Sequence, residues 1–416
     1  MFHGNIARTG SYESPGPKQL SGVLWTFKTN GPVLASPSIA NGVLFIGSAD
    51  GSFHAIDQKT GKEIWKFETQ GQIASSAAIV GGIVYFSSYD GTFYALDAAT
   101  GTPKWRFAMD YERRFEIQGL HGISPKHQTI PEPWDFFTSS PAVIDDHVYF
   151  GGGDGNVYAL NAGSGTLLWK FATGNVVHTS PAVVQNTVYV GSWNSNLYAL
   201  DAITGKEKWR FEAGRDPEIH NQEGFTSSPA VVNGVVYVGC RDSHVYALDA
   251  FTGAKKWDFS TKGAWVSATP AVRDRRLYVT TGASDEFPAR LVALDTQTGE
   301  SRFLFDIKTG GFSSAVVSAD MVYVGNTNGR LYAVDSKSGK LVWQFQTENA
   351  KKDAFDVLNQ DGSFKDRLTN FTFYDFQDRY VWMYKRFSVG AIVSSPVLDQ
   401  GNIYFGSTDG FVYALH

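Results

Sequence analysis

An eleven-residue phrase recurs along the chain with little change, and it constrains the fold more than any other feature. Its first copy reads AIDQKTGKEIW and spans Ala55–Trp65. Four further copies read ALDAATGTPKW, ALDAITGKEKW, ALDAFTGAKKW and AVDSKSGKLVW, and they begin at Ala95, Ala199, Ala247 and Ala333. Repetition at this interval predicts an array of similar structural units rather than one irregular core.

Each unit contains four short runs that are typical of β-strands. The unit that begins at Ser180 reads SPAVV, TVYVGS, NLYALD and KWRF, with turn residues between the runs. Four strands in ~40 residues are typical of one β-propeller blade. The predicted first strand begins at eight positions, which are Ser36, Ser76, Ser140, Ser180, Ser228, Thr269, Ser314 and Ser395.

The fourth run carries an aromatic residue, and this residue also occurs eight times. The eight positions are Trp25, Trp65, Trp105, Trp169, Trp209, Trp257, Phe303 and Trp343. We expect these side chains to dock between neighbouring blades, with the indole N–H bonded to a backbone acceptor. A row of ligand-stacking rings is the alternative. Gly61 and its equivalents are expected to supply the positive φ of the preceding turn, and Asp57 to accept backbone N–H groups there.

The two ends of the sequence complement each other. The first run, VLWTF, is a fourth strand, and the last, FVYALH, is a third strand. The N-terminal strand can therefore complete the last blade and close the ring. The predicted fold is all-β, an eight-bladed β-propeller of four-stranded antiparallel blades. We expect one domain over residues 1–416, with an N-terminal arm at 1–21.

Variation in length is concentrated in one class of connection. From the fourth-strand aromatic to the next first strand, Trp25 to Ser36 is 11 residues, whereas Trp105 to Ser140 is 35 and Trp343 to Ser395 is 52. These connections share a face in an up-and-down blade, as binding loops on repeat proteins commonly do. We expect insertions on that face at about 108–137, 213–225 and 346–392, and we expect function there and at the mouth of the central channel.

Composition excludes several classes of protein. With 36 basic and 41 acidic residues, the net charge of −5 gives no general reason to expect nucleic acid. Cys240 is the only cysteine, which excludes internal disulfides, C-x-x-C-H haem attachment and a zinc–thiolate cage. No apolar run approaches ~18 residues, so no transmembrane helix is expected. The start MFHGNIARTG lacks the regions of a signal peptide, which fits either a cytoplasmic protein or a mature form.

The repeat resembles a known family. YALDAxTGxxxW around an eight-bladed ring is similar to the tryptophan-docking repeat of the PQQ-type propellers, and the start FHGNIARTG resembles the mature N-terminus of many PQQ-repeat proteins. The family includes quinoprotein alcohol dehydrogenases and BamB-like outer-membrane assembly lipoproteins. The resemblance covers the chain outside the insertions, and it implies a fold more than an activity because enzymes and non-enzymes share the repeat.

The enzymatic branch of this family would bring a quinone on the channel axis, Ca²⁺, a catalytic Asp and a vicinal cysteine pair. Cys240 stands alone, so the pair cannot exist, and its position matches Ser48, Ser88 and Ser192 of other blades. We therefore predict neither a cofactor, nor a metal site, nor catalytic residues. PQQ and Ca²⁺ are expected only if the chain is a dehydrogenase.

Candidate ligand residues lie at the expected channel mouth and in the insertions. The residue two places before each first strand should face the mouth, and His178 is the one titratable side chain in that set. The first insertion offers Arg113, His121 and Trp134, and the second offers His220 and Glu223. His121 and His127 are six residues apart, which does not indicate a metal site. His220 and the carboxylates near it could bind a hard or borderline metal, but a solvated loop is the simpler interpretation.

The third insertion contains FTFYDFQDRYVWMYKRF, with eight aromatic residues in 17. It could form a small core that holds the insertion against the propeller. Alternatively, Trp382, Tyr384 and Arg386 could anchor a glycan, peptide or protein.

Three functions follow as hypotheses. The first is a non-catalytic, BamB-like propeller, periplasmic or envelope-associated, that binds a partner protein or extended ligand on the insertion-bearing face. The second is a PQQ- and Ca²⁺-dependent alcohol or sugar dehydrogenase, and the third is a polysaccharide lyase or hydrolase. The first is favoured, with no enzymatic activity. We expect a monomer, because a closed ring has no sheet edge that demands a partner.

Overall fold

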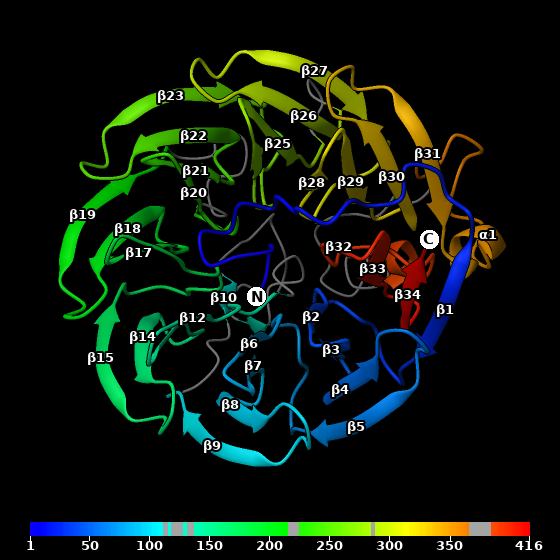
Figure 1. Cartoon of the computed structure of the whole chain (residues 1–416). Helices are drawn as coiled ribbons and strands as arrows, with labels where there is room; N and C mark the ends of the chain where they lie inside the picture. Colours follow the sequence, from blue (N-terminus) through cyan, green and yellow to red (C-terminus); the bar gives the residue numbers. More distant parts are fainter. Residues whose placement is uncertain (111–114, 118–127, 131–136, 215–223, 284–287, 366–383) are drawn as a thin grey trace.

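Eight four-stranded antiparallel sheets are arranged in a ring around a central axis (Figure 1). The computed structural model describes residues 1–110, 115–117, 128–130, 137–214, 224–283, 288–365 and 384–416. The predicted eight-bladed β-propeller is confirmed. Outside the blades, a short hairpin pairs β10 (Phe115–Ile117) with β11 (Gln128–Ile130), and α1 (Glu348–Lys352) follows the seventh blade.

In each blade the four strands pair antiparallel in order, with the first strand nearest the axis and the fourth on the outside of the ring. Blades one to four are β2–β5 (Ser38–Ala40, Val43–Gly47, Ser52–Asp57, Glu63–Glu68), β6–β9 (Ala78–Val80, Ile83–Ser88, Thr92–Asp97, Pro103–Ala108), β12–β15 (Ala142–Ile144, His147–Gly151, Asn156–Asn161, Leu167–Ala172) and β16–β19 (Ala182–Val184, Thr187–Gly191, Asn196–Asp201, Glu207–Glu212). Blades five to seven are β20–β23 (Ala230–Val232, Val235–Gly239, His244–Asp249, Lys255–Ser260), β24–β27 (Ala271–Arg273, Arg276–Thr280, Arg290–Asp295, Ser301–Asp306) and β28–β31 (Val316–Ser318, Met321–Gly325, Arg330–Asp335, Leu341–Gln346).

The eighth blade contains both ends of the chain. β32 (Val397–Asp399), β33 (Asn402–Gly406) and β34 (Phe411–Leu415) are completed by β1 (Val23–Lys28), which pairs antiparallel with β34. Closure by the N-terminal strand is therefore confirmed. The ring closes through backbone hydrogen bonds between the two ends of the chain, and no blade is left with only three strands.

Burial follows the position of a strand in its blade. The second and third strands, such as β3 and β4, are buried along nearly their whole length, whereas the outer strand β5 alternates between exposed and half-buried residues. Hydrophobic clusters form between neighbouring blades, and one of them joins Trp209 of the fourth blade to Val236 and Leu248 of the fifth. The core is thus a series of interfaces between blades rather than one central mass.

The innermost strands begin two residues later than predicted. β2 begins at Ser38 rather than Ser36, and the other seven first strands show the same shift. The reason is that the backbone N–H of Ser36 bonds to the neighbouring blade rather than to its own sheet. In most blades a proline follows this residue and cannot donate to a strand ladder.

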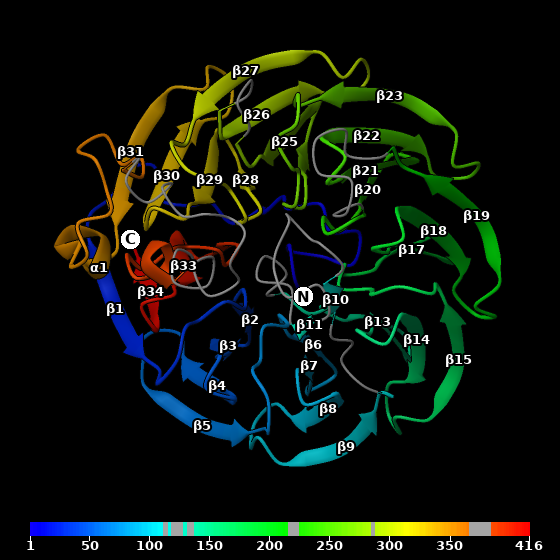
Figure 2. The same ribbon diagram turned by 180° about the vertical axis from the view of Figure 1, so that it is seen from behind.

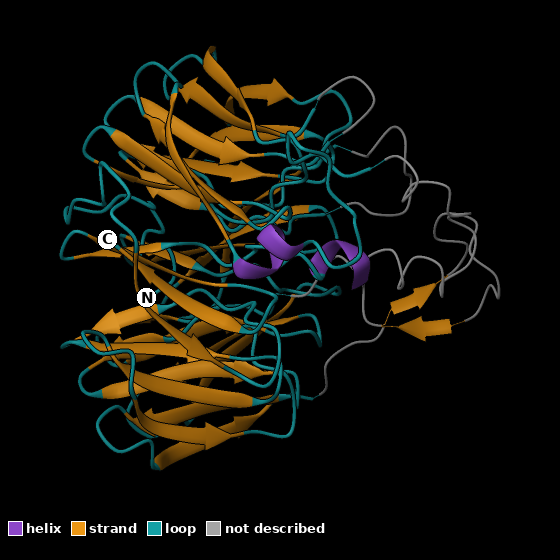
Figure 3. Cartoon of the chain, turned by 90° about the vertical axis from the view of Figure 1, so that its right-hand side faces the viewer, coloured by secondary structure: helices purple, strands orange, loops and turns teal. Residues whose placement is uncertain are grey.

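The two faces of the ring differ. The turns between third and fourth strands lie on one face, here called the turn face, together with the N-terminal arm (Figures 1 and 3). The connections between blades and α1 lie on the other face, here called the insertion face (Figures 2 and 3). Among the described residues, no helix is both long and apolar enough to cross a membrane.

Candidate functional site

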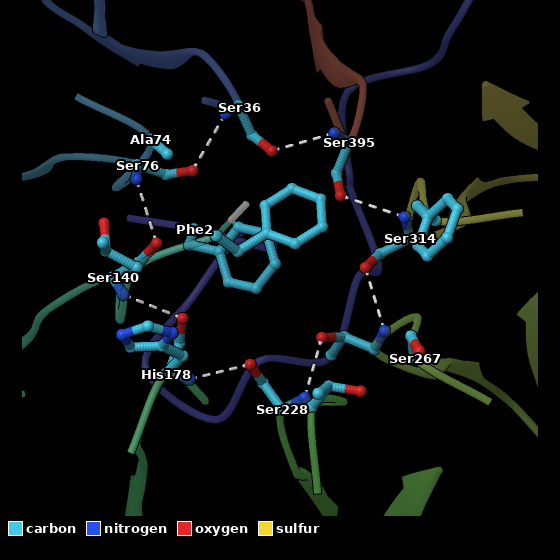
Figure 4. Close-up of a pocket in the computed structure, with 16 residues that line it drawn as sticks. Phe2, Ser36, Ala74, Ser76, Ser140, His178, Ser228, Ser267, Ser314 and Ser395 are labelled. Carbon is cyan, nitrogen blue, oxygen red and sulfur yellow. Dashed lines mark hydrogen bonds between the residues drawn. The ribbon is translucent and has the colours of Figure 1, made fainter. Parts of the chain in front are cut away.

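A closed ring of hydrogen bonds surrounds the axis, one from each blade to the next. The backbone N–H of Ser36 donates to Ser76 Oγ at 3.0 Å, and the pattern continues until Ser395 N–H donates to Ser36 Oγ at 2.8 Å (Figure 4). The eight members, here called the hydroxyl ring, are Ser36, Ser76, Ser140, Ser180, Ser228, Thr269, Ser314 and Ser395, with distances of 2.8–3.2 Å. The repeated Ser/Thr therefore fastens the blades together at the centre.

The hydroxyl ring encloses a small cavity of about 40 Å³. Phe2 of the arm lies in the centre of the ring, and Phe137 and Phe312 also line the space (Figure 4). A water molecule needs roughly 10–15 Å³ measured in this way, and pockets for small organic ligands are typically about 300–1,000 Å³. The axial space in this structure therefore has room for a few water-sized groups.

The residues two places before the hydroxyl ring form the channel mouth on the insertion face, and they divide into two arcs. Blades three to six supply a polar arc, and blades seven, eight, one and two supply an apolar arc. The polar arc is Thr138, His178, Thr226 and Ser267, and the apolar arc is Phe312, Val393, Leu34 and Ala74. In the polar arc, the hydroxyl oxygens of Thr138, Thr226 and Ser267 are buried and have no hydrogen-bond partner among the described residues. Buried hydroxyl groups usually have a partner, which can be a protein group or an ordered water.

The apolar arc is packed by aromatic side chains from distant parts of the chain. Leu34, Ala74, Ala391 and Val393 form a buried cluster, and Tyr89, Phe137, Phe312 and Phe387 pack against it. This cluster covers one side of the mouth with hydrocarbon. The mouth therefore presents polar groups on one side only.

His178 lies in the polar arc, where the sequence analysis placed it. It is 8% exposed, lines the axial cavity, and its ring meets Tyr89 edge to face with centroids 6.2 Å apart. A metal role would need neighbouring ligands. In the described part of the chain, no group of three or more His, Cys, Asp or Glu side chains could hold an ion.

The N-terminal arm fills the axis from the turn face. The carbonyls of Ile6, Ala7, Thr9 and Gly10 accept N–H groups from the innermost strands of blades four to seven, at 2.7–3.0 Å. Two polar side chains of the arm, His3 and Arg8, are buried. The ring nitrogens of His3 lie 2.8 Å from Arg8 O and 2.9 Å from Ala315 O, and burial lowers the pKa of His3 to about 4.

A second cluster at the insertion face was missed in the sequence analysis. The guanidinium of Arg241 is fully buried between two indoles, 4.2 Å from the Trp193 ring centroid and 4.9 Å from that of Trp265. Arg241 and Trp193 occupy the same place in their blades, directly after the Ser or Cys that follows the second strand. Tyr89 and Ala49 occupy that place in other blades, so variation at one repeat position was the signal that could have found this cluster.

Cys240, next to Arg241, is buried and structural. Its Sγ lies 3.4 Å from Gly224 O, and burial raises the pKa of the thiol well above its usual value. A thiol in that state is a poor nucleophile and a poor metal ligand.

Most of the other predicted ligand residues lie outside the described residues. These are Arg113, His121, Trp134, His220, Glu223 and Trp382. Tyr384 is described and is 61% exposed, with its ring 6.3 Å from the ring of Phe355. Arg386 is half-buried and lies over the ring of Phe364 at 4.3 Å, and burial lowers the pKa of Arg386 to about 9. The roles of the six residues outside the described ranges remain predictions.

The repeated aromatics lie far from this mouth, near the turn face. Seven indole N–H groups donate to a backbone carbonyl at 2.9–3.0 Å, six of them to the turn of the next blade, from Gln58 O for Trp25 to Thr296 O for Trp257. The seventh, Trp343, donates to Pro17 O, so the arm replaces the turn that the broken eighth blade lacks. These residues hold blade to blade.

Comparison with known proteins identifies the family of this chain. The sequence profile of the family described as "Outer membrane protein assembly factor BamB" matches residues 19–119, 112–258 and 218–416. The chain belongs to this family.

Solved structures with the same architecture include BamB and dehydrogenases. BamB from Moraxella catarrhalis is 16% identical, with a TM-score of 0.65 over 95% of this chain and 97% of that one. A europium-containing methanol dehydrogenase is 14% identical, with a TM-score of 0.70 over 100% and 97%. The quinohemoprotein alcohol dehydrogenase from Comamonas testosteroni is 16% identical, with a TM-score of 0.68 over 99% and 79%. At these identities the likeness concerns the fold alone.

One curated relative is an enzyme. Quinohemoprotein alcohol dehydrogenase ADH IIB from Pseudomonas putida is 29% identical over 104 residues, which are 22% of this chain and 14% of that protein. The match therefore spans a small part of the enzyme, and a shared repeat accounts for it.

The described residues of this BamB-family chain do not fit a quinone with Ca²⁺ on the axis. Calcium takes six to eight oxygen ligands, usually with carboxylates among them. None of the described side chains that line the axial cavity carries a carboxylate, and the space of about 40 Å³ is far below that of a pocket for an organic cofactor. The acidic turn residues do not supply the ligands either. Asp90, for example, accepts from Thr92 N at 2.9 Å and from the Tyr94 hydroxyl at 2.8 Å, which makes it a turn residue.

Proposed function

We propose that this chain is a non-catalytic, BamB-like propeller of the cell envelope that binds a partner protein on its insertion face. The single observation that carries the proposal is the filled axis. Phe2, Phe137 and Phe312 leave about 40 Å³ where the dehydrogenases of this fold class would need a cofactor. A propeller whose centre is packed must act through its surface.

Exposed aromatic surface on the third insertion supports partner binding. Phe355 is 51% exposed and Tyr384 is 61% exposed, and their rings contact each other edge to face. Large aromatic side chains that stay in water cost free energy, and they are typical anchors of protein interfaces. The family supports the envelope location, since its profile is described as an outer membrane protein assembly factor.

The test compares two exposed aromatic positions on opposite faces. A photo-crosslinking amino acid replaces Tyr384 on the third insertion or Phe251 in the turn between β22 and β23, where the side chain is 74% exposed. We expect irradiation of cells that make the protein to yield an adduct from position 384, with mass spectrometry identifying an envelope protein. Position 251 should yield none, because the turn face is the uniform side of the ring.

Adducts from position 251 alone, or equal adducts from both positions, would contradict the proposed face. Tyr384→Ala and Phe355→Ala in the same chain should each lower the yield from a second crosslinker at Lys352, which is exposed at the end of α1. The dehydrogenase hypothesis has no support in the described cavity. The lyase or hydrolase hypothesis depends on His220 and Glu223, and it remains a prediction.

A further inference from the structure

The arm carries a buried positive charge that no described acidic group balances. Arg8 is fully buried, and its four hydrogen bonds among the described residues all go to backbone carbonyls. Nε donates to Pro181 O at 3.0 Å, Nη1 to Phe2 O at 2.8 Å, and Nη2 to Ser140 O and Pro141 O at 2.9 Å each. Within the described ranges, no carboxylate forms an ion pair with it. Carbonyls satisfy hydrogen bonds but leave the net charge in place, and a buried charge without a counter-charge is costly.

Arg8 does not itself line the axial cavity, but it contacts the backbone of two residues that do. Ser140, whose carbonyl Arg8 contacts, is a member of the hydroxyl ring, and Phe2, whose carbonyl Arg8 also contacts, lies in the centre of the ring. Burial lowers the pKa of Arg8 to about 9, so the guanidinium is still charged at pH 7. Burial also lowers the pKa of His3, the other buried titratable side chain of the arm, to about 4.

The cavity walls carry hydroxyl groups that still have hydrogens to donate. Each oxygen of the hydroxyl ring accepts a backbone N–H, and none of the eight hydroxyls donates to an acceptor among the described residues. A hydroxyl has one hydrogen to give, so eight hydrogens remain. The orphaned hydroxyls of Thr138, Thr226 and Ser267 add three more on the polar arc. The remaining lining is aromatic, apart from Ala74 and His178.

We propose that the axial cavity binds a monovalent anion of halide size, with hydroxyl hydrogens of the polar arc and the hydroxyl ring as donors and Arg8 as the counter-charge. The cavity of about 40 Å³ admits an ion of that size with one or two waters. Water alone would satisfy hydroxyl hydrogens but would leave the charge of Arg8 unbalanced. The anion would stabilise the contact between the arm and the blades, since it would bind groups from both.

The test measures thermal unfolding of the full chain in sodium bromide and in sodium gluconate at equal ionic strength and pH. We expect a saturable rise in Tm with bromide. The double variant Thr138→Val, Ser267→Ala removes two donors, and the bromide concentration at half effect should rise by about tenfold or more. The matched control is Ser318→Ala, which deletes a buried hydroxyl that donates to Ser14 O at 2.7 Å, away from the cavity. Its bromide dependence should equal that of the wild type.

Crystals grown in bromide provide the second measurement. We expect an anomalous difference peak inside the hydroxyl ring. Arg8→Met removes four hydrogen bonds and is expected to release the arm, so the hydroxyl variant and the crystal carry the test. A Tm that does not distinguish bromide from gluconate, or anomalous peaks confined to the outer surface, would overturn the proposal. Neither measurement depends on the partner protein proposed above.

Discussion

The eight repeated aromatics Trp25, Trp65, Trp105, Trp169, Trp209, Trp257, Phe303 and Trp343, here called the docking ring, lie near the turn face. The docking ring and the channel mouth on the insertion face are built from the same eight repeats, but the first is nearly uniform and the second varies. In the docking ring, seven indoles make the same bond at 2.9–3.0 Å. At the mouth, the eight equivalent positions hold seven residue types, which are Leu, Ala, Thr, His, Ser, Phe and Val. Uniform positions hold blades together, and positions that vary are available for function.

The largest effect is expected from a docking residue. Trp209 is 9% exposed and donates to Ala250 O at 3.0 Å. Trp209→Ala should lower the free energy of unfolding by about 3–5 kcal/mol, because it leaves a cavity between two blades. Urea denaturation measures it. Trp209→Phe is the control, since Phe303 fills this place in the sixth blade, and it should cost much less. Equal losses in both variants would show that docking does not depend on side-chain volume.

Two glycines with positive φ allow the stability cost of disturbing a docked indole to be measured apart from the cost of the backbone conformation. Gly205 has φ +68°, and a Cβ there would lie 2.6 Å from the Trp169 ring, whereas Gly401 has φ +81° and nothing within 4 Å of that position. Gly401→Ala should cost about 1–2 kcal/mol for the left-handed backbone. Gly205→Ala should cost about 1–3 kcal/mol more, because the added methyl displaces the indole. If urea denaturation gives the same loss in the free energy of unfolding for both variants, the close packing of Gly205 against Trp169 does not contribute to stability.

A second pair compares the hydroxyl ring with the mouth. Ser140→Ala leaves the buried N–H of Ser76 without its 3.0 Å acceptor and should cost about 1–3 kcal/mol. Thr138→Val, two residues away, removes an orphaned hydroxyl at nearly constant shape. In halide-free buffer it should leave the free energy of unfolding unchanged or raise it slightly. A large loss for Thr138→Val would mean that its hydroxyl already has a partner.

The smallest effect concerns acid stability at the sixth blade. Asp295 lies 2.5 Å from Arg302 Nη2 and 3.0 Å from Arg275 Nε, and the hydrogen bond from Arg302 holds the pKa of Asp295 well below its usual value. A lowered folded pKa gives stability that is present above about pH 4 and is lost as the pH falls below it. Asp295→Asn should therefore flatten the acid side of a Tm-against-pH curve. Arg302→Gln should flatten it similarly, and an unchanged slope in both variants would contradict this role.

The fold was predictable because its determinants are local and repeated. The blade number and the closing strand follow from spacings within about 40 residues, and the structure confirms both. The glycines that contact the docking aromatics are also specified locally. Gly61, for example, lies against the ring of Trp25, which is one repeat away in the sequence.

The channel mouth was predictable only in its positions. Sequence spacing placed His178 near the axis, but the packing there joins Phe2, Phe137 and Phe312, which lie far apart in the chain. Arg8 was not recognised at all, because its carbonyl partners Ser140 and Pro181 lie 132 and 173 residues away. These contacts join residues outside the repeated motif, so the spacing of the repeats does not predict them.

The claim that the axis is filled by the protein's own side chains is tested most directly by a quinone titration. Isothermal titration calorimetry measures the binding of pyrroloquinoline quinone to the full chain in the presence of Ca²⁺. The packed cavity, lined in its described part without a carboxylate, predicts no saturable heat up to millimolar quinone. One-to-one binding with a micromolar or tighter Kd would contradict the account and would return the chain to the enzymes that share its fold.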